Sequence, residues 1–257
     1  MGRKYFFFDI DGTLLVGPPG RQYMPESAKL ALKKLRGAGH FVAIATGRGH
    51  MMAVDLMAEL DIHNAVTDGG NGIVVNDEVK KLEPMDYERC MALIDELKEK
   101  DFIWSFCPED SRVRTAPDER FGNVTGDVYM KNVVIPDLDH KKYKNIYKIF
   151  IACEPGREKE LAALSDLEWC RYQEEYLFVE PDDKAHGIDL MEDLLGIEDG
   201  DVVVFGDSKN DLSMFNGRWL SVAMGNAPDF LKEKATFVTT DAGDDGIFNA
   251  CRHFKWI

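Results

Sequence analysis

The sequence predicts an α/β protein with a parallel-sheet core and an inserted α+β segment. Three observations predict this: strand and helix patterns alternate at the start of the chain, they alternate again after Pro181, and between these regions a helix is followed by several adjacent strands. Strand–helix–strand units of this length give parallel strand pairs. We therefore expect a discontinuous core domain of residues 1–83 and 182–257, and an inserted domain of residues 84–181.

The first alternating unit begins with the apolar run Tyr5–Phe8, which is short enough to be a fully buried strand. A helix is expected from Pro25 and Glu26, because proline is favoured early in a helix and acid in its first turn. The helix ends near Gly37, and residues 40–45 follow as a second buried strand. The two strands should lie parallel in one sheet.

The remaining elements continue this pattern on both sides of the insertion. In the core we expect helices at about 50–60 and 186–195, a further helix after residue 211, a helix from residue 228, and strands at 64–67, 73–75, 202–205, 220–224 and 237–239. In the insertion we expect helices at about 86–100 and 159–164, and strands at 102–106, 149–151, 169–171 and 176–179.

Composition and charge exclude several functions. Acidic residues number 46 and basic residues 31, which gives a formal net charge of −15. This charge repels nucleic acid and anionic lipid, so we expect neither as a partner. No stretch is long enough to span a bilayer. The five cysteines are dispersed and form no C-x-x-C pair, which favours a cytoplasmic protein. The oligomeric state stays open.

Three predicted strands end in polar residues. Asp9 and Asp11 follow the first strand, Thr46 follows the second, and the run 206–211 follows the strand after the insertion. Ligands of open parallel sheets bind outside the carboxyl ends of the strands. We therefore expect these side chains to converge in one crevice.

The residue types in this crevice suit a phosphate and a metal ion. Asp9 and Asp11, two residues apart on an extended segment, face the same side, and such a pair needs a cation or a shared proton. With Asp207 they offer the hard oxygen ligands that Mg²⁺ prefers. Thr46 adds a hydroxyl donor, and Gly47 leaves its backbone N–H accessible to an anion.

Lys184 lies just before the predicted helix near residue 186. A cation at this point could neutralise charge on a phosphoryl group. The alternative is a surface lysine paired with Asp182 or Asp183. Its position relative to the other polar residues favours the phosphate-binding role.

The polar residues also resemble a known family. Asp9-Ile10-Asp11-Gly12-Thr13, Ala45-Thr46-Gly47-Arg48, Lys184 and the run 206–211 resemble, in order, the four motifs of the haloacid dehalogenase-like (HAD) phosphotransferases. The large insertion between the second and third motifs is similar to that of the Cof-like subfamily. One departure is Ser208-Lys209, where the family often has glycine and a varied residue. The resemblance implies a Rossmann-like core with an inserted cap.

The resemblance further implies a Mg²⁺-dependent phosphatase for a small phosphorylated metabolite such as a sugar phosphate, acting through an aspartyl-phosphate. Asp9 would be the nucleophile and Asp11 the general acid/base. The phosphoryl group would be bound by Thr46, Gly47, Lys184 and Asn210. The metal would be held by Asp9, Asp11 and Asp207, with Asp211 binding its waters.

Two alternatives remain at this stage. A phosphomutase of the same superfamily also carries a cap at this place, although its fourth motif is longer than residues 206–211. A non-catalytic sugar-phosphate sensor is a different class, against which the intact Asp9 and Asp11 count. Dehalogenase activity is disfavoured, since that chemistry does not need the second aspartate. Substrate specificity is expected to come from residues 84–181.

Overall fold

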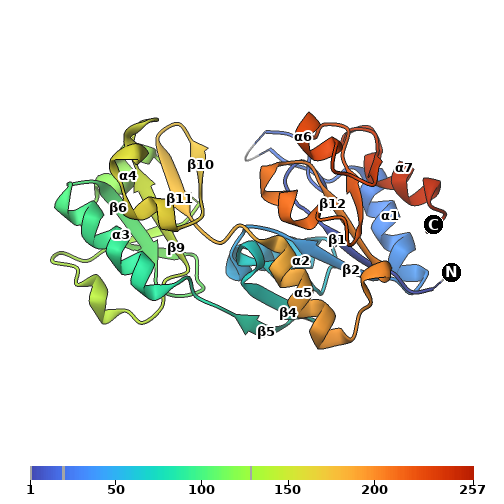
Figure 1. Cartoon of the computed structure of the whole chain (residues 1–257), viewed down its shortest axis with the longest axis horizontal. Helices are drawn as coiled ribbons and strands as arrows, with labels where there is room; N and C mark the ends of the chain where they lie inside the picture. Colours follow the sequence, from blue (N-terminus) through green and yellow to red (C-terminus); the bar gives the residue numbers. More distant parts are fainter. Residues whose placement is uncertain (1, 19–20, 128) are drawn as a thin grey trace. The chain divides into compact units, whose positions relative to one another are not determined.

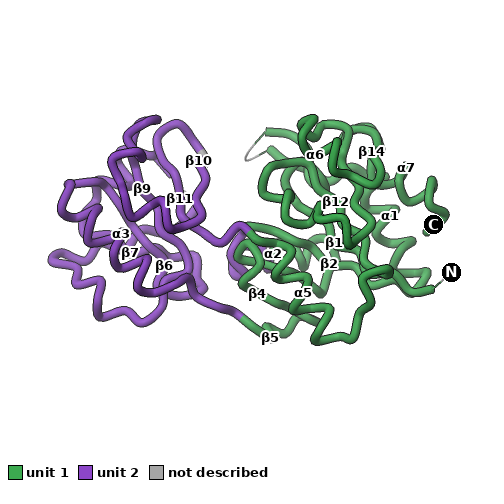
Figure 2. The backbone as a smooth tube through the Cα atoms, in the orientation of Figure 1, with its two compact units in different colours: residues 1–47, 55–81, 183–257 green, residues 48–54, 82–182 purple. Residues whose placement is uncertain are grey.

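The computed structural model describes residues 2–18, 21–127 and 129–257. The chain divides into two compact units, each with its own β-sheet and helices (Figure 1). Unit 1 comprises residues 1–47, 55–81 and 183–257, and unit 2 comprises residues 48–54 and 82–182 (Figure 2). The predicted fold class is confirmed: the protein is α/β, with a mainly parallel core sheet and a second, inserted sheet.

Among the described residues, unit 1 contains an eight-stranded sheet in the order β14-β13-β12-β1-β2-β3-β4-β5. Neighbouring strands from β14 to β3 pair in parallel, and β4 pairs antiparallel with β3. β1 lies between β12 and β2, so the residue that follows β1 stands at the middle of the carboxyl edge. The strands are β1 (Tyr5–Phe8), β2 (Phe41–Ala45), β3 (Ala65–Thr67), β4 (Gly72–Val75), β5 (Glu78–Leu82), β12 (Val202–Gly206), β13 (Leu220–Ala223) and β14 (Phe237–Val238).

Helices cover both faces of this sheet, because successive strand side chains point to opposite sides. Phe7 of β1 packs in a core with Ile188 and Met191. Phe6 contacts Trp256 on the other face, with ring centroids 4.8 Å apart. The helices of unit 1 are α1 (Glu26–Gly37), α2 (His50–Glu59), whose first turn groups with unit 2, α5 (Lys184–Leu195), α6 (Asp229–Lys232) and α7 (Gly246–His253), with 3₁₀ helices η1 (Asp68–Gly70), η5 (Asp199–Asp201) and η6 (Lys209–Met214).

Unit 2 contains a six-stranded sheet, counted over its described residues, in the order β10-β11-β9-β6-β7-β8. All neighbours pair antiparallel except β7 and β8. One core forms against α3, and a smaller cluster forms around Phe121 of α4. The elements are α3 (Tyr87–Glu99), β6 (Ile103–Cys107), β7 (Val113–Ala116), α4 (Arg120–Thr125), β8 (Lys131–Val134), η2 (His140–Lys142), β9 (Lys148–Ala152), η3 (Arg157–Glu160), η4 (Ala163–Asp166), β10 (Trp169–Gln173) and β11 (Tyr176–Val179).

The first turn of α2 groups with unit 2, although the rest of the helix belongs to unit 1. The Asp110 carboxylate accepts a hydrogen bond from the Met51 backbone N–H at 2.9 Å and pairs with His50 Nδ1 at 2.8 Å. An acid at a helix N-terminus satisfies amides that have no partner within the helix. The expected domain boundaries at residues 84 and 181 stay a proposal, because a compact unit is not thereby shown to fold alone.

Two predicted helices differ in the structure. The segment expected to be helical at 159–164 forms the separate 3₁₀ helices η3 and η4. The reason is that the Glu96 carboxylate accepts hydrogen bonds from the backbone amides of Ala162 (3.0 Å) and Ala163 (2.9 Å), which a continuous helix would need. The helix expected after residue 211 is the six-residue 3₁₀ helix η6, which begins at Lys209.

The helix expected from residue 186 begins two residues earlier, at Lys184. Asp183 caps it, with the side chain accepting a hydrogen bond from the His186 backbone N–H at 3.2 Å. Across the described part of the chain, no helix combines the length and apolar character needed to cross a membrane.

Candidate active site

Three strands of unit 1 deliver polar residues to one edge of the sheet. Phe8 is in register with both Phe205 of β12 and Ile44 of β2, so the residues after these three strands leave the sheet at similar levels. The Asp9 backbone N–H donates to the Phe205 carbonyl at 3.0 Å, which extends the ladder by one residue. The three strands therefore position Asp9, Thr46 and Asp207 by backbone pairing.

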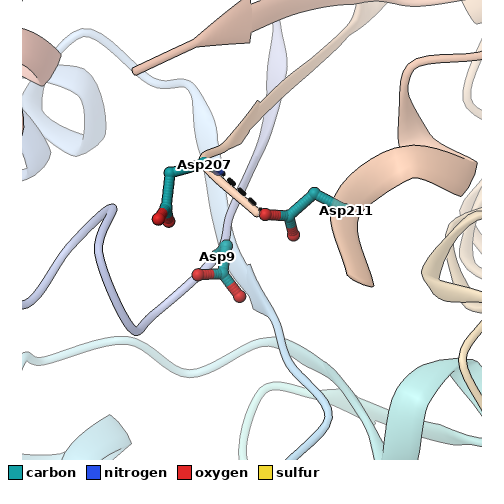
Figure 3. A group of neighbouring side chains, drawn as sticks. All are labelled: Asp9, Asp207 and Asp211. Atoms are coloured by element: carbon teal, nitrogen blue, oxygen red, sulfur yellow. Dashed lines mark hydrogen bonds between the residues drawn. The ribbon is translucent and has the colours of Figure 1, made fainter. Parts of the chain in front are cut away.

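Asp9, Asp207 and Asp211 form an acidic cluster in which one carboxylate oxygen of each lies within 4.8 Å of the others (Figure 3). Lys184 joins two of them: its Nζ donates to Asp9 Oδ1 at 2.5 Å and to Asp211 Oδ1 at 2.6 Å. The lysine is fully buried. The alternative of a surface lysine paired with Asp182 or Asp183 is therefore wrong.

The acidic cluster holds more negative than positive charge, and burial makes that imbalance unfavourable. The pKa of Asp9 is raised well above its usual value by burial and then by Asp211, while Lys184 opposes the rise. Burial also raises the pKa of Asp207 to about 7, against a hydrogen bond from Thr13 that lowers it. Burial alone would lower the pKa of Lys184, but the two carboxylates raise it. One lysine does not balance three carboxylates, so the site suits a further cation.

Asp211 is held on both carboxylate oxygens. Oδ1 accepts from Lys184, and Oδ2 accepts from the backbone N–H groups of Asp207 (2.9 Å) and Ser208 (3.0 Å). The Asp207 bond is the dashed line of Figure 3. Ser208 and Asp211 also form the capping box that starts η6. Asp211 therefore fixes the backbone that carries Asp207 and orients Lys184.

Thr13, the last residue of the first motif, and Asn226, for which the sequence predicted no role, orient the Asp207 carboxylate. Thr13 Oγ1 donates to Oδ1 at 2.8 Å, and Asn226 Nδ2 lies 3.3 Å from Oδ2. The same amide donates to the Gly12 carbonyl at 2.9 Å. Gly12 has φ +93°, and a Cβ there would lie 2.2 Å from Asp207 Oδ2. The available sequence signal was a polar residue shortly after a predicted strand, as at the other site positions.

Close backbone contacts seat Lys184 at the start of α5. Gly70 has φ +117°, and a Cβ at this position would lie 2.0 Å from the Asp183 carbonyl oxygen. A Cβ on Gly187, one turn into the helix, would lie 2.3 Å from Val66 Cγ1. A side chain at Gly70 would push the start of α5 away from η1, and a side chain at Gly187 would push the helix away from β3. These contacts explain how Lys184, which is distant from Asp9 in sequence, reaches the Asp9 carboxylate.

The structure gathers some of the expected site residues more closely than others. Asp9, Lys184, Asp207 and Asp211 are joined by the contacts above. Thr46 is buried directly after β2, next to Gly47, and Asn210 lies in η6, where its Oδ1 accepts a hydrogen bond from Ser208 Oγ at 2.5 Å. Asp11 is exposed, and its carboxylate is not part of the acidic cluster found among the described residues.

The fold and the site together define an α/β enzyme with a carboxylate–lysine centre at the carboxyl edge of its parallel sheet. A sequence model of the family described as haloacid dehalogenase-like hydrolase matches residues 6–251, so the chain belongs to that family. It is 32% identical to "Putative phosphatase YkrA" of Bacillus subtilis (strain 168), over 98% of each chain. The predicted membership of the Cof-like group is thereby confirmed.

Two further relatives describe the kind of reaction. The chain is 27% identical to the 5-amino-6-(5-phospho-D-ribitylamino)uracil phosphatase YwtE of Bacillus subtilis (strain 168), over 95% of each chain. The structure of the present chain resembles that of the HAD subclass IIB sugar phosphatase BT4131, with a TM-score of 0.78 and 29% identity. The match covers 99% of this chain and 100% of BT4131. The predicted enzyme class, a HAD phosphatase for small phosphorylated metabolites, is confirmed.

Proposed function

We propose that the protein is a Mg²⁺-dependent phosphatase that hydrolyses a sugar phosphate through an aspartyl-phosphate on Asp9. The observation that carries this proposal is the buried Asp9 carboxylate, which Lys184 holds beside two further carboxylates at the centre of the sheet edge. The family of the chain and the names of its relatives support the phosphatase reaction. The sugar-phosphate class is supported by the likeness to BT4131.

The donor set fits a magnesium ion. Asp9 and Asp207 would hold it, since both oxygens of Asp211 already accept hydrogen bonds from Lys184 and from backbone amides. When bound, Mg²⁺ would neutralise negative charge on the phosphoryl oxygens. Asp211 would then act on the metal through the backbone of Asp207. The Asp11 carboxylate lies outside the acidic cluster. Its expected role near the metal therefore remains a proposal.

The first chemical step uses two aspartates. Oδ1 of Asp9 accepts one hydrogen bond from Lys184 and keeps a second lone pair for the metal, so Oδ2 would be left to attack phosphorus. As the Asp9–phosphorus bond forms, the bond from phosphorus to the leaving oxygen breaks, and that oxygen takes a proton from Asp11. In the second step a water molecule attacks phosphorus and gives its proton to Asp11. The bond to Asp9 then breaks, and inorganic phosphate leaves.

The remaining site residues would bind the phosphoryl oxygens. Lys184 has three N–H groups and uses two of them on Asp9 and Asp211, so one is left for phosphate. The Thr46 hydroxyl, the Gly47 backbone N–H and the Asn210 side-chain amide would supply the other donors. Donors aimed at the charge that develops during transfer are the main source of acceleration in such reactions.

A hydrolysis screen over phosphorylated sugars and sugar alcohols, with and without Mg²⁺, tests the proposal. We expect release of inorganic phosphate from a sugar phosphate, and loss of this activity in excess chelator. Interconversion of sugar phosphates without phosphate release would indicate a phosphomutase. Binding of a sugar phosphate without any turnover would indicate a sensor, and either result would overturn the proposed function.

A further inference from the structure

Asp11 has a side-chain partner that the mechanism above does not use. Gln22 Nε2 donates a hydrogen bond to Asp11 Oδ1 at 2.7 Å. Asp11 is the proton donor and acceptor of the proposed reaction, yet it lies outside the acidic cluster and is exposed to solvent. A hydrogen bond to one oxygen of an exposed carboxylate narrows the rotamers it samples, which raises the fraction of time in which a proton transfer can occur. Gln22 therefore contacts the proposed general acid directly.

Backbone hydrogen bonds hold the chain near both residues of this contact. Gly12 N–H donates to the Leu15 carbonyl at 2.9 Å, which closes a tight turn directly after Asp11. Val16 and Tyr23 then exchange two backbone hydrogen bonds of 3.0 Å each, as the closing pair of a hairpin. Gln22 precedes Tyr23, so the hairpin brings its side chain back to Asp11. The backbone pairing of Val16 with Tyr23 therefore places the Gln22 side chain within hydrogen-bonding distance of Asp11.

The amide donor of Gln22 makes the two oxygens of the Asp11 carboxyl group different from each other. An N–H group that occupies Oδ1 of a carboxyl group leaves the proton of the acid form on the other oxygen, Oδ2. We propose that Gln22 is a positioning residue, which orients Asp11 so that Oδ2 delivers the proton to the leaving oxygen. This inference rests on the proposed function, since it assumes that Asp11 is the general acid. The proton passes from Oδ2 as the bond from phosphorus to the leaving oxygen breaks.

Leaving groups of different basicity test the inference. An alkoxide needs a proton as it leaves, whereas p-nitrophenolate does not. With enzyme in excess, the first turnover of Gln22→Leu should release sugar from the best sugar phosphate of the screen about tenfold more slowly than wild type. Release of p-nitrophenol from p-nitrophenyl phosphate should change by less than about twofold. Tyr23→Phe is the matched control in the same hairpin and should leave both rates unchanged.

A double-mutant cycle with Asp11→Asn separates positioning from other roles. If Gln22 acts through Asp11, Gln22→Leu causes no further loss once Asp11 is replaced. Gln22→Glu, which keeps the size of the side chain but removes the donor and adds a like charge, should slow sugar release more than Gln22→Leu. Melting temperatures of all variants show whether each is folded.

The outcomes distinguish this inference from the proposed function. Unchanged sugar release in both Gln22 variants, equal losses for both leaving groups, or additive losses in the cycle would each overturn the role of Gln22. Wild-type rates of sugar release in Asp11→Asn would overturn the general acid itself, and with it the proposed mechanism. Selective loss of sugar release in Gln22→Leu, absent from the Asp11→Asn background, supports the positioning role.

Discussion

At the residue scale, Lys184 decides how the charges of the site are balanced. Its single positive charge lies between Asp9 and Asp211, both buried, and removing it would leave two carboxylates facing each other in a region of low dielectric. Breaking a buried ion pair by removing one partner typically destabilises a protein by about 3–5 kcal/mol. The lysine therefore has a structural role that is separate from any contact with phosphate.

We predict that Lys184→Ala lowers both stability and catalysis. The melting temperature should fall, because the two carboxylates lose their shared partner, and kcat/KM for phosphoesters should fall by at least about 100-fold. Differential scanning calorimetry and steady-state kinetics measure the two effects. Lys33→Ala, the same change at an exposed position of α1, is the control and should alter neither. Wild-type kinetics in folded Lys184→Ala would remove the lysine from the reaction.

Asp9→Asn tests the nucleophile. The amide has nearly the same shape as the carboxylate but cannot attack phosphorus, so kcat should fall by at least about 1000-fold while the fold is kept. Wild-type enzyme quenched in acid after mixing with ³²P-labelled substrate should carry label on the protein, and the variant should carry none. Asp193→Asn, an exposed position of α5, is the matched control. A variant that kept a tenth of the wild-type activity would contradict the covalent mechanism.

The residue scale is also where the sequence was least informative. Asp9, Asp207 and Asp211 could be predicted because each follows a strongly apolar strand. Asn226 also follows a predicted strand, but nothing in the sequence pairs it with Asp207. Gln22 could not be predicted, since it reaches Asp11 from a separate loop and no local pattern fixes how a loop returns to the sheet.

At the element scale, alternation of apolar strands and helices was enough to predict the central strands and the parallel pairing of β1 with β2. The pattern could not show where side chains interrupt a helix. Glu96 takes the amides that a continuous helix over 159–164 would need, and it lies more than sixty residues away in sequence. The start of α5 is similarly set by the Asp183 side chain. Both effects depend on side-chain contacts rather than on periodicity.

The start of β2 gives a prediction about pH at this scale. His40 is buried directly before the strand, and its Nδ1 accepts a hydrogen bond from the Lys4 backbone N–H at 3.0 Å. Burial lowers the pKa of His40 below its usual value. The unfolded chain therefore binds this proton at a higher pH than the folded chain does. The contribution of His40 to stability is complete above about pH 6.5 and is lost as the pH falls below it.

His40→Asn should remove this pH dependence, because the Asn oxygen can still accept from Lys4 but does not titrate. The free energy of unfolding, measured by urea titration at pH 7.5 and pH 5.5, should fall less in the variant than in wild type. The difference can be at most about 1.4 kcal/mol for each pH unit below the unfolded pKa. His253→Asn, at the exposed end of α7, is the control. A fall as large in His40→Asn as in wild type would show that other groups carry the effect.

At the scale of the whole molecule, charge and substrate are opposed. The chain has a formal net charge of −15, which repels a phosphorylated metabolite, so binding must depend on local positive groups. In unit 1 the groups proposed for phosphate are few and recognise little beyond the phosphoryl group itself. Preference among metabolites must then come from other parts of the chain. We propose that residues 84–181, expected from the sequence to form a separate domain, provide it.

Replacing residues 84–181 by a short Gly/Ser linker tests this division of roles. The linker removes Asp110, which holds the first turn of α2, so circular dichroism and a cooperative melt must first show that the shortened protein is folded. We expect slow, Mg²⁺-dependent hydrolysis of p-nitrophenyl phosphate to remain, because Asp9, Lys184 and Asp207 lie in unit 1. The ratios of kcat/KM among sugar phosphates should shrink towards one, since the groups that distinguish one sugar from another are gone. A folded, shortened protein that kept the ranking and ratios of the full chain would place specificity in unit 1 and contradict the proposal.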